Sequence, residues 1–115
     1  MATKVELRNQ VLQELEVLPA GQTASAEDAV TVETRIDQVY AFLEDKEIAY
    51  WDANNIPAEV MRPMVKIVAY ECAPAFQLPP DKIALHKAQH DTGMRDLYAH
   101  VAAQRGGEPI KATYY

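Results

Sequence analysis

The longest amphipathic stretch of the chain, from Ser25 to Glu47, constrains the fold more than any other feature. Ser25 followed by Asp28 is an N-cap pattern, because the hydroxyl accepts a hydrogen bond from a helix amide and the acid favours the positive helix start. Apolar residues at steps of three and four share one face: Ala29, Val32, Ile36, Val39 and Leu43. The spacing predicts a central helix with one buried face and one solvated, acidic face.

Another helix is predicted ahead of this stretch. Thr3 with Glu6 forms a capping box before a helix that runs to about Glu16. Its apolar stripe comprises Leu7, Val11, Leu12, Leu15 and Leu18. The connection PAGQTA is short, so we expect this helix to fold back on the Ser25 helix as an αα hairpin.

The segment after Pro57 is densely apolar and is predicted to form the most buried helix. Pro63 removes one hydrogen bond, so this helix either kinks there or begins only near Met61. Two sets of side chains are expected to face each other in the core: Met64, Val68 and Phe76 from this segment, and Ile36, Val39 and Leu43 from the Ser25 helix.

A fourth helix is expected from about Asp81 to the glycines at 106 and 107, with close packing or a bend at Gly93. Residues 108–115, EPIKATYY, have no place in the helical pattern. No strand pattern competes with the four helices. The predicted fold class is therefore all-α, a compact four-helix domain over residues 1–107 with an extended C-terminal tail over residues 108–115.

Acidic residues are concentrated in the first half of the chain. Residues 14–59 carry eleven acids against Arg35 and Lys46, a balance of −9, whereas residues 60–115 carry five acids against seven bases, a balance of +2. This distribution disfavours a helix-turn-helix DNA binder, which needs clustered Lys and Arg. It suits a surface that DNA passes without sticking, one that meets a basic partner, or one kept acidic for solubility.

Signals for catalysis and metal binding are weak. His86 and His90 have the i, i+4 spacing of a shared metal, but Lys87 stands where a zinc protease has Glu, and no third ligand follows from spacing. The single cysteine, Cys72, excludes an internal disulfide and is interpreted as a buried small hydrophobe. No carboxylate pair, Gly-rich phosphate loop or nucleophile elbow stands out. We predict a protein that is not an enzyme and that holds no metal or cofactor.

No apolar run approaches the roughly 18 residues of a membrane span. The opening segment, MATKVELRNQ, lacks the apolar centre of a secretory signal. We therefore expect a soluble, intracellular protein with no membrane partner.

Tyr50 and Trp51 are adjacent rings in a loop rich in Asp and Asn. We expect them to cap one end of the core, because such a loop has no other reason to carry large rings. The alternative is that Trp51 is an anchor for a partner protein.

The run LQELEVLPAGQTASAEDAVTVETRIDQVYAFLED, then Trp51, then IPAEV before an apolar helix ending in APAFQLPP, resembles the head-to-tail connector adaptors of tailed bacteriophages. This group includes the tail accessory factor of short-tailed phages. The resemblance covers roughly Leu7 to Pro80, and it rests on the order and spacing of the helix ends together.

The resemblance implies a small helical protein that joins the portal protein as a dodecameric ring after DNA packaging, extends the DNA channel and presents a surface to the next tail or connector protein. It places the protein at the head-tail junction of the virion, after synthesis in the host cytoplasm. Neighbouring copies are partners, and DNA passes without sequence-specific binding. In that setting Glu33, Asp37 and Glu44 are predicted to face the channel.

Larger members of the family carry longer insertions or C-terminal extensions that reach the portal, whereas this chain offers only the tail after Gly107. We expect this tail to be disordered in the free protein and ordered on assembly, against the portal or a neighbouring subunit; a frayed terminus is the alternative. Its predicted partner-binding residues are Ile110, Lys111, Thr113, Tyr114 and Tyr115. The alternative function is a small acidic intracellular regulator, such as an antitoxin, that binds a basic protein.

Overall fold

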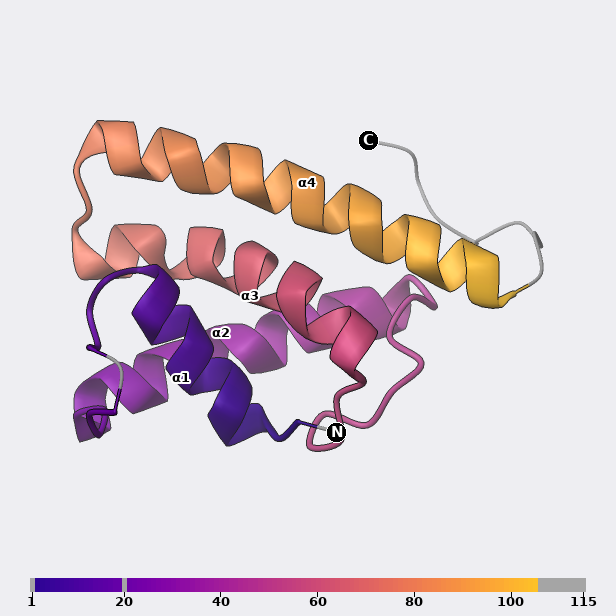
Figure 1. The fold of residues 1–115 in the computed structure, drawn as a ribbon, viewed down its shortest axis with the longest axis horizontal. Helices are drawn as coiled ribbons and strands as arrows, with labels where there is room; N and C mark the ends of the chain where they lie inside the picture. The colour runs from indigo at the N-terminus through magenta and orange to yellow at the C-terminus, as the bar shows by residue number, and fades with distance from the viewer. Residues whose placement is uncertain (1, 20, 106–115) are drawn as a thin grey trace.

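The computed structural model describes residues 2–19 and 21–105, and within them the chain is helical (Figure 1). The helices are α1 (Lys4–Glu14), α2 (Ala26–Asp45), α3 (Ala58–Cys72) and α4 (Pro80–Gln104), with a short 3₁₀ helix η1 (Ala73–Phe76) between the last two. The described residues form two isolated β-bridges and no strand. The all-α prediction is confirmed, whereas the predicted boundary at 107 and the tail over 108–115 lie outside the described residues.

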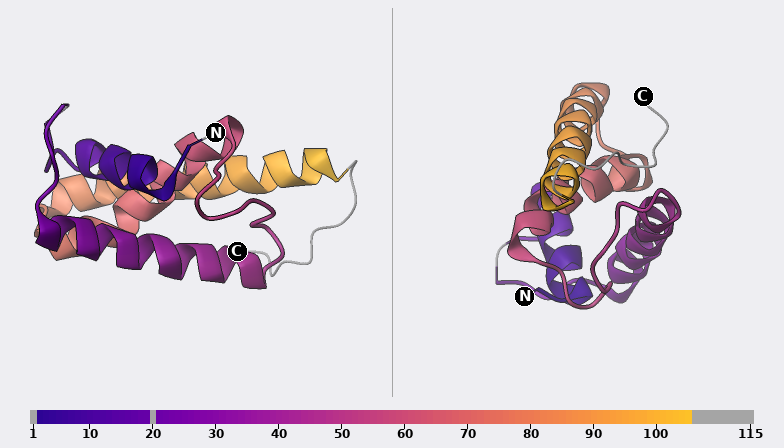
Figure 2. Two further views of the ribbon diagram at one scale, coloured as in Figure 1. Left: turned by 90° about the horizontal axis from the view of Figure 1, so that it is seen from below. Right: turned by 90° about the vertical axis from the view of Figure 1, so that its right-hand side faces the viewer.

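The central helix is α3, which packs against α1, α2 and α4 (Figures 1 and 2). Nine of its fifteen residues are buried, against four of the twenty in α2. A helix that is apolar on most sides is driven inside, while a helix with one apolar stripe covers a side of the core. The prediction of the most buried helix is confirmed, but the prediction that the Ser25 helix is central was wrong.

The predicted N-caps are present on the first two helices. The Thr3 hydroxyl accepts from the Glu6 amide and the Ser25 hydroxyl from the Asp28 amide, each at 3.2 Å. The αα hairpin is also confirmed, because α1 and α2 pack against each other after the short connection. Two ion pairs, Arg8 to Glu33 and Lys4 to Asp37, join the two helices.

Both hairpin helices end in a turn that the sequence did not signal. Glu16 after α1 and Glu47 after α2 adopt left-handed backbone angles, with φ of 63° and 62°. In each turn the next amide donates to a carbonyl five residues back, from Val17 to Leu12 and from Ile48 to Leu43. This is the Schellman arrangement with Glu where Gly is usual, so α1 ends at Glu14, before the expected Glu16.

The third helix begins at Ala58 and continues through Pro63, so the alternative of a start near Met61 was wrong. Pro63 lies opposite Gly93 of α4. A Cβ placed on Gly93 of α4 would lie 3.0 Å from the Pro63 carbonyl oxygen and 3.1 Å from Cβ of Lys66. The close packing expected at Gly93 is therefore confirmed.

The two sets of core side chains belong to one buried cluster, with one exception. Met64 and Val68 of α3 are buried in one cluster with the apolar stripe of α2. Phe76 of η1 is only partly buried and packs against the edge of that cluster. It lies beyond the end of α3, where less of the bundle covers it.

Candidate docking groove between α2 and α4

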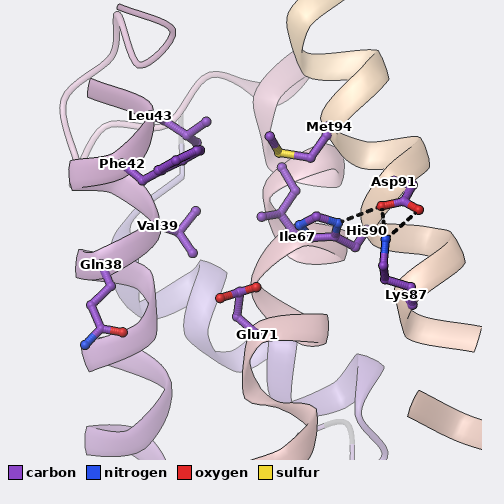
Figure 3. Close-up of a pocket in the computed structure, with 10 residues that line it drawn as sticks. All are labelled: Gln38, Val39, Phe42, Leu43, Ile67, Glu71, Lys87, His90, Asp91 and Met94. Atoms are coloured by element: carbon purple, nitrogen blue, oxygen red, sulfur yellow. Dashed lines mark hydrogen bonds and ion pairs between the residues drawn. The ribbon is translucent and has the colours of Figure 1, made fainter. Parts of the chain in front are cut away.

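An open groove of about 740 Å³ separates α2 from α4. Both helices pack on α3 but make at most a marginal contact with each other, and the end-on view in Figure 2 shows them apart. Figure 3 shows side chains from α2 and α4 as the two walls, with those of α3 between them. The groove is lined by Gln38, Val39, Phe42, Leu43, Ile67, Glu71, Lys87, His90, Asp91 and Met94.

The deep part of the groove is apolar. Val39, Leu43 and Ile67 are buried residues of the core, and Met94 is partly buried against them. Phe42 is different, because 51% of it is exposed on the α2 wall. Surfaces that bind another apolar segment commonly combine an exposed aromatic ring with buried aliphatic side chains.

A fixed polar cluster borders the groove on α4. Lys87 Nζ lies 2.8 Å from both carboxylate oxygens of Asp91, and His90 Nδ1 lies 3.1 Å from one of them (Figure 3). The hydrogen bond from Lys87, and then that from His90, lowers the pKa of Asp91, while the bond to Asp91 raises the pKa of Lys87. The His90 ring also packs on Tyr70 of α3, with ring centroids 5.0 Å apart. These contacts hold the rim in place before any ligand arrives.

The histidines and the cysteine that the sequence singles out lie in different surroundings. Within residues 2–19 and 21–105, no group of three or more His, Cys, Asp or Glu side chains could hold a metal ion. His86 and His90 line different cavities, and His86 is 6% exposed. Cys72 is fully buried, and burial raises its pKa to about 12, as its interpretation as a core residue requires.

A second, smaller cavity of about 490 Å³ lies between the end of α1 and the start of α4. Leu85, 52% exposed, and the buried His86 both line it. His86 Nδ1 has no hydrogen-bond partner among the described residues. Sequence spacing singled out His86 as half of a metal pair, whereas its position is that of a core histidine facing a cavity.

The acidic side chains predicted to face a channel are distributed unequally. Glu33 forms an ion pair with Arg8 at 2.8 Å and Asp37 one with Lys4 at 2.6 Å, whereas Glu44 is exposed near the end of α2. Glu14 and Glu16 have basic partners too, at 3.6 and 3.9 Å. All four bases lie outside residues 14–59, so the tertiary structure neutralises part of the −9 balance that the segment carries alone.

Trp51 is a core residue. It is 6% exposed, with its ring centroid 5.2 Å from that of Tyr50 and 6.2 Å from that of Tyr40. The Tyr40 hydroxyl donates to the Trp51 carbonyl, which fixes the loop to α2. The core cap fits this position better than the partner anchor, because the ring is covered. The other predicted partner-binding residues, Ile110, Lys111, Thr113, Tyr114 and Tyr115, lie outside the described residues.

No protein-family model matches the chain, and neither curated proteins nor solved structures give a significant match. In the described part of the chain, every helix is too short or too polar to cross a membrane. The groove itself was not predicted from the sequence. Phe42, an aromatic residue off the apolar stripe of α2, is the sequence signal from which the groove could have been found.

Proposed function

We propose that this protein is a structural adaptor of the phage head-tail connector type. It joins the portal protein as a ring, with twelve copies the number that the resemblance implies, and extends the DNA channel. It then offers an attachment surface to the next tail or connector protein. It acts by binding proteins and carries out no reaction.

The observation that carries the proposal is the match between the residues of the resemblance and the ends of the helices. Ser25 is the N-cap of α2, Pro57 precedes the first residue of α3, and Ala73 to Phe76 form η1. These residues fall at helix boundaries, and this supports the proposal. The α2–α4 groove adds a surface on which a protein segment can dock, as an adaptor requires.

The acidic end of α2 is the part of the surface we assign to the channel. Glu44 and Asp45 are both exposed there, whereas Glu33 and Asp37 are held by α1. An acidic wall repels phosphates and lets DNA pass without sticking. The channel proposal therefore rests on Glu44 more than on Glu33 and Asp37.

The direct test is to mix the purified protein with portal rings of the same virus and to determine stoichiometry by native mass spectrometry. We expect a monomer or weak oligomer alone and twelve copies on each portal ring. Protein that stays unbound at tens of micromolar, about the affinity of a weak complex, would overturn the proposal. Capture of a basic protein from the same cells would then favour the acidic regulator.

A second test separates the channel surface from the fold. Glu44→Lys should leave the ring intact and slow DNA exit, because a cation on the channel wall attracts the backbone phosphates. Gln10→Lys, an exposed change on α1, is the matched control for the added charge. Normal DNA release from Glu44→Lys particles would show that this end of α2 does not face the channel.

A further inference from the structure

We propose that the α2–α4 groove binds an amphipathic helix of another protein, one that carries apolar anchors and a basic residue on the same face. The proposal rests on the proposed function in taking the groove as an attachment surface, and it adds the chemistry of the partner. Four features of the groove carry it: the order of its lining along the helices, an unpaired carboxylate, the backbone that surrounds it, and its length.

The lining changes from apolar to polar along the groove. Phe42, Leu43 and Met94 lie at one end, toward the C-terminal ends of α2 and α4 (Figure 3). Glu71 and Lys87 lie toward the other end. An apolar occupant would leave the second end unmatched, and a polar one would leave the ring of Phe42 in water. The groove therefore fits a segment whose buried face changes from apolar to charged in the same order.

The polar end carries a carboxylate without an ion-pair partner. Lys87 is already neutralised by Asp91, which holds its ammonium at 2.8 Å. Arg35 on α2 donates to Gln38 at 3.0 Å. Glu71 is exposed, and no ion pair between described residues includes it. A basic side chain of an occupant pairs with Glu71 without displacing an existing contact, so charge complementarity favours a basic partner.

The backbone around the groove favours a helical occupant over an extended one. The walls and the floor are helices, whose backbone donors and acceptors are used within each helix. An extended segment gains backbone hydrogen bonds by joining a strand edge, and the described part of the chain has no strand. Its N–H and C=O groups would lose water over the apolar end and find no partner there. A helix satisfies its own backbone and places only side chains in the groove.

The groove is about two helical turns long. On α4 its lining runs from Lys87 to Met94, about 10 Å at a rise of about 1.5 Å per residue. Over this distance a docked helix presents side chains at i, i+4 and i+7 or i+8 on one face. Two of these positions lie over the apolar end, near Phe42 and Ile67, and the third lies near Glu71. The expected partner motif is thus two apolar residues one turn apart, with a base one turn further on.

A second copy of this chain offers no such helix among its described residues. Its exposed large apolar side chains are Val5, Val30, Phe42, Tyr50 and Leu85. No two of them lie three or four residues apart on one helix, so no described helix exposes two apolar anchors on one face. Two copies, each with a net charge of −6, also repel each other. The occupant is therefore another protein, which in the connector proposal is the portal protein or the next tail protein.

A pair of designed peptides tests the proposal on the full-length protein. The lysine probe is a helix of about 18 residues, rich in alanine and glutamine, with two leucines four residues apart and a lysine three residues beyond each. Either orientation then brings a lysine to Glu71. The glutamate probe has glutamate at both lysine positions. We expect the lysine probe to shift the NMR signals of residues 38–43 and 87–94, with a Kd of about 100 µM, and the glutamate probe to bind at least about threefold more weakly.

Variants of the protein show whether Glu71 is the partner of the base. Glu71→Lys should invert the preference, so that the glutamate probe binds at least about threefold more tightly than the lysine probe. Asp96→Lys, an equal change of charge at an exposed position of α4 outside the groove lining, should keep the original preference. Phe42→Ser should weaken both probes, whereas Val30→Ser, exposed on α2 outside the groove, should weaken neither.

Four results would overturn the proposal. The first is no binding of the lysine probe at about 1 mM, and the second is equal binding of the two probes to the unmodified protein. The third is a set of shifts confined to residues outside the groove. The fourth is a set of groove shifts that grow with protein concentration when no probe is present, which would assign the groove to a second copy.

The connector function is tested separately, by attachment of the unmodified protein to portal rings. Failure of that attachment would refute the connector function and leave the selectivity of the groove for the lysine probe as measured. Failure of the probes would refute the basic helix as occupant and leave portal attachment as measured. The two results are therefore distinguishable.

Discussion

The two sides of α4 behave differently, although one helix provides both. Toward α3, Gly93 lets the helices approach until a Cβ would meet the Pro63 carbonyl at 3.0 Å. Toward α2, the same helix presents His90 and Met94 to an open groove. We call these two regions the seam and the groove.

The difference follows from the position of α3. Because α3 is apolar on most sides, it occupies the middle and takes α2 and α4 as separate neighbours. Once it lies there, α2 and α4 cannot close on each other. The groove is thus a consequence of how the core packs, and it leaves the ring of Phe42 exposed for a partner.

The largest effect on stability is expected in the seam. Leu97 on α4 is fully buried, and Leu97→Ala should reduce the free energy of unfolding by about 2–5 kcal/mol through lost burial and a cavity. Chemical denaturation measures this change. Leu85→Ala, at a half-exposed position of the same helix, is the control and should cost far less. Equal losses of unfolding free energy in the two variants would mean that the side of α4 facing α3 is not the one that stabilises the fold.

A second variant tests the seam by adding atoms at Gly93 instead of removing them. Gly93→Val should destabilise the fold by about 1–3 kcal/mol, because the new side chain meets backbone that cannot shift cheaply. The melting temperature and the midpoint of denaturant unfolding report this loss of stability. Ala99→Val adds a branched side chain at an exposed position of α4 and controls for helix propensity. A variant at 93 as stable as the one at 99 would contradict the close approach.

The ends of the helices lie in neither the seam nor the groove. A change there tests a separate source of stability, the backbone strain of the turn. Glu16→Gly should stabilise the protein by about 0.5–1 kcal/mol, since glycine adopts the left-handed angle without strain. The lost pair with Lys82 at 3.9 Å is exposed and contributes little. Glu16→Ala removes the same charge without relieving the strain and should not gain stability. If Ala stabilised as much as Gly, charge rather than backbone strain would be the cause.

The smallest effect on stability is expected in the groove, where binding should change most. Phe42→Ser should alter the free energy of unfolding by less than about 0.5 kcal/mol, as surface changes do. The same variant should weaken the binding of a partner in the groove, measured by portal attachment. Val30→Ser serves as the control on α2. A large drop in the melting temperature of the Phe42→Ser variant would show that this ring belongs to the core rather than to the groove.

Local sequence patterns determined much of this protein. The caps at Thr3 and Ser25, the fold-back of the first two helices and the close packing at Gly93 followed from short-range chemistry. Hydrogen bonds within a few residues, and the presence or absence of a side chain, decide such features wherever the segment lies. The all-α class follows for the same reason.

Tertiary structure alone decided which helix is central, which acids are neutralised and where a groove remains. Amphipathicity showed that the Ser25 helix has a buried stripe, but α3 displaced it from the centre because it buries more of its surface. Glu33 and Asp37 looked like a bare acidic face until α1 brought Arg8 and Lys4 to them. These features depend on contacts between residues far apart in the chain, and no local spacing encodes which distant side chains will meet.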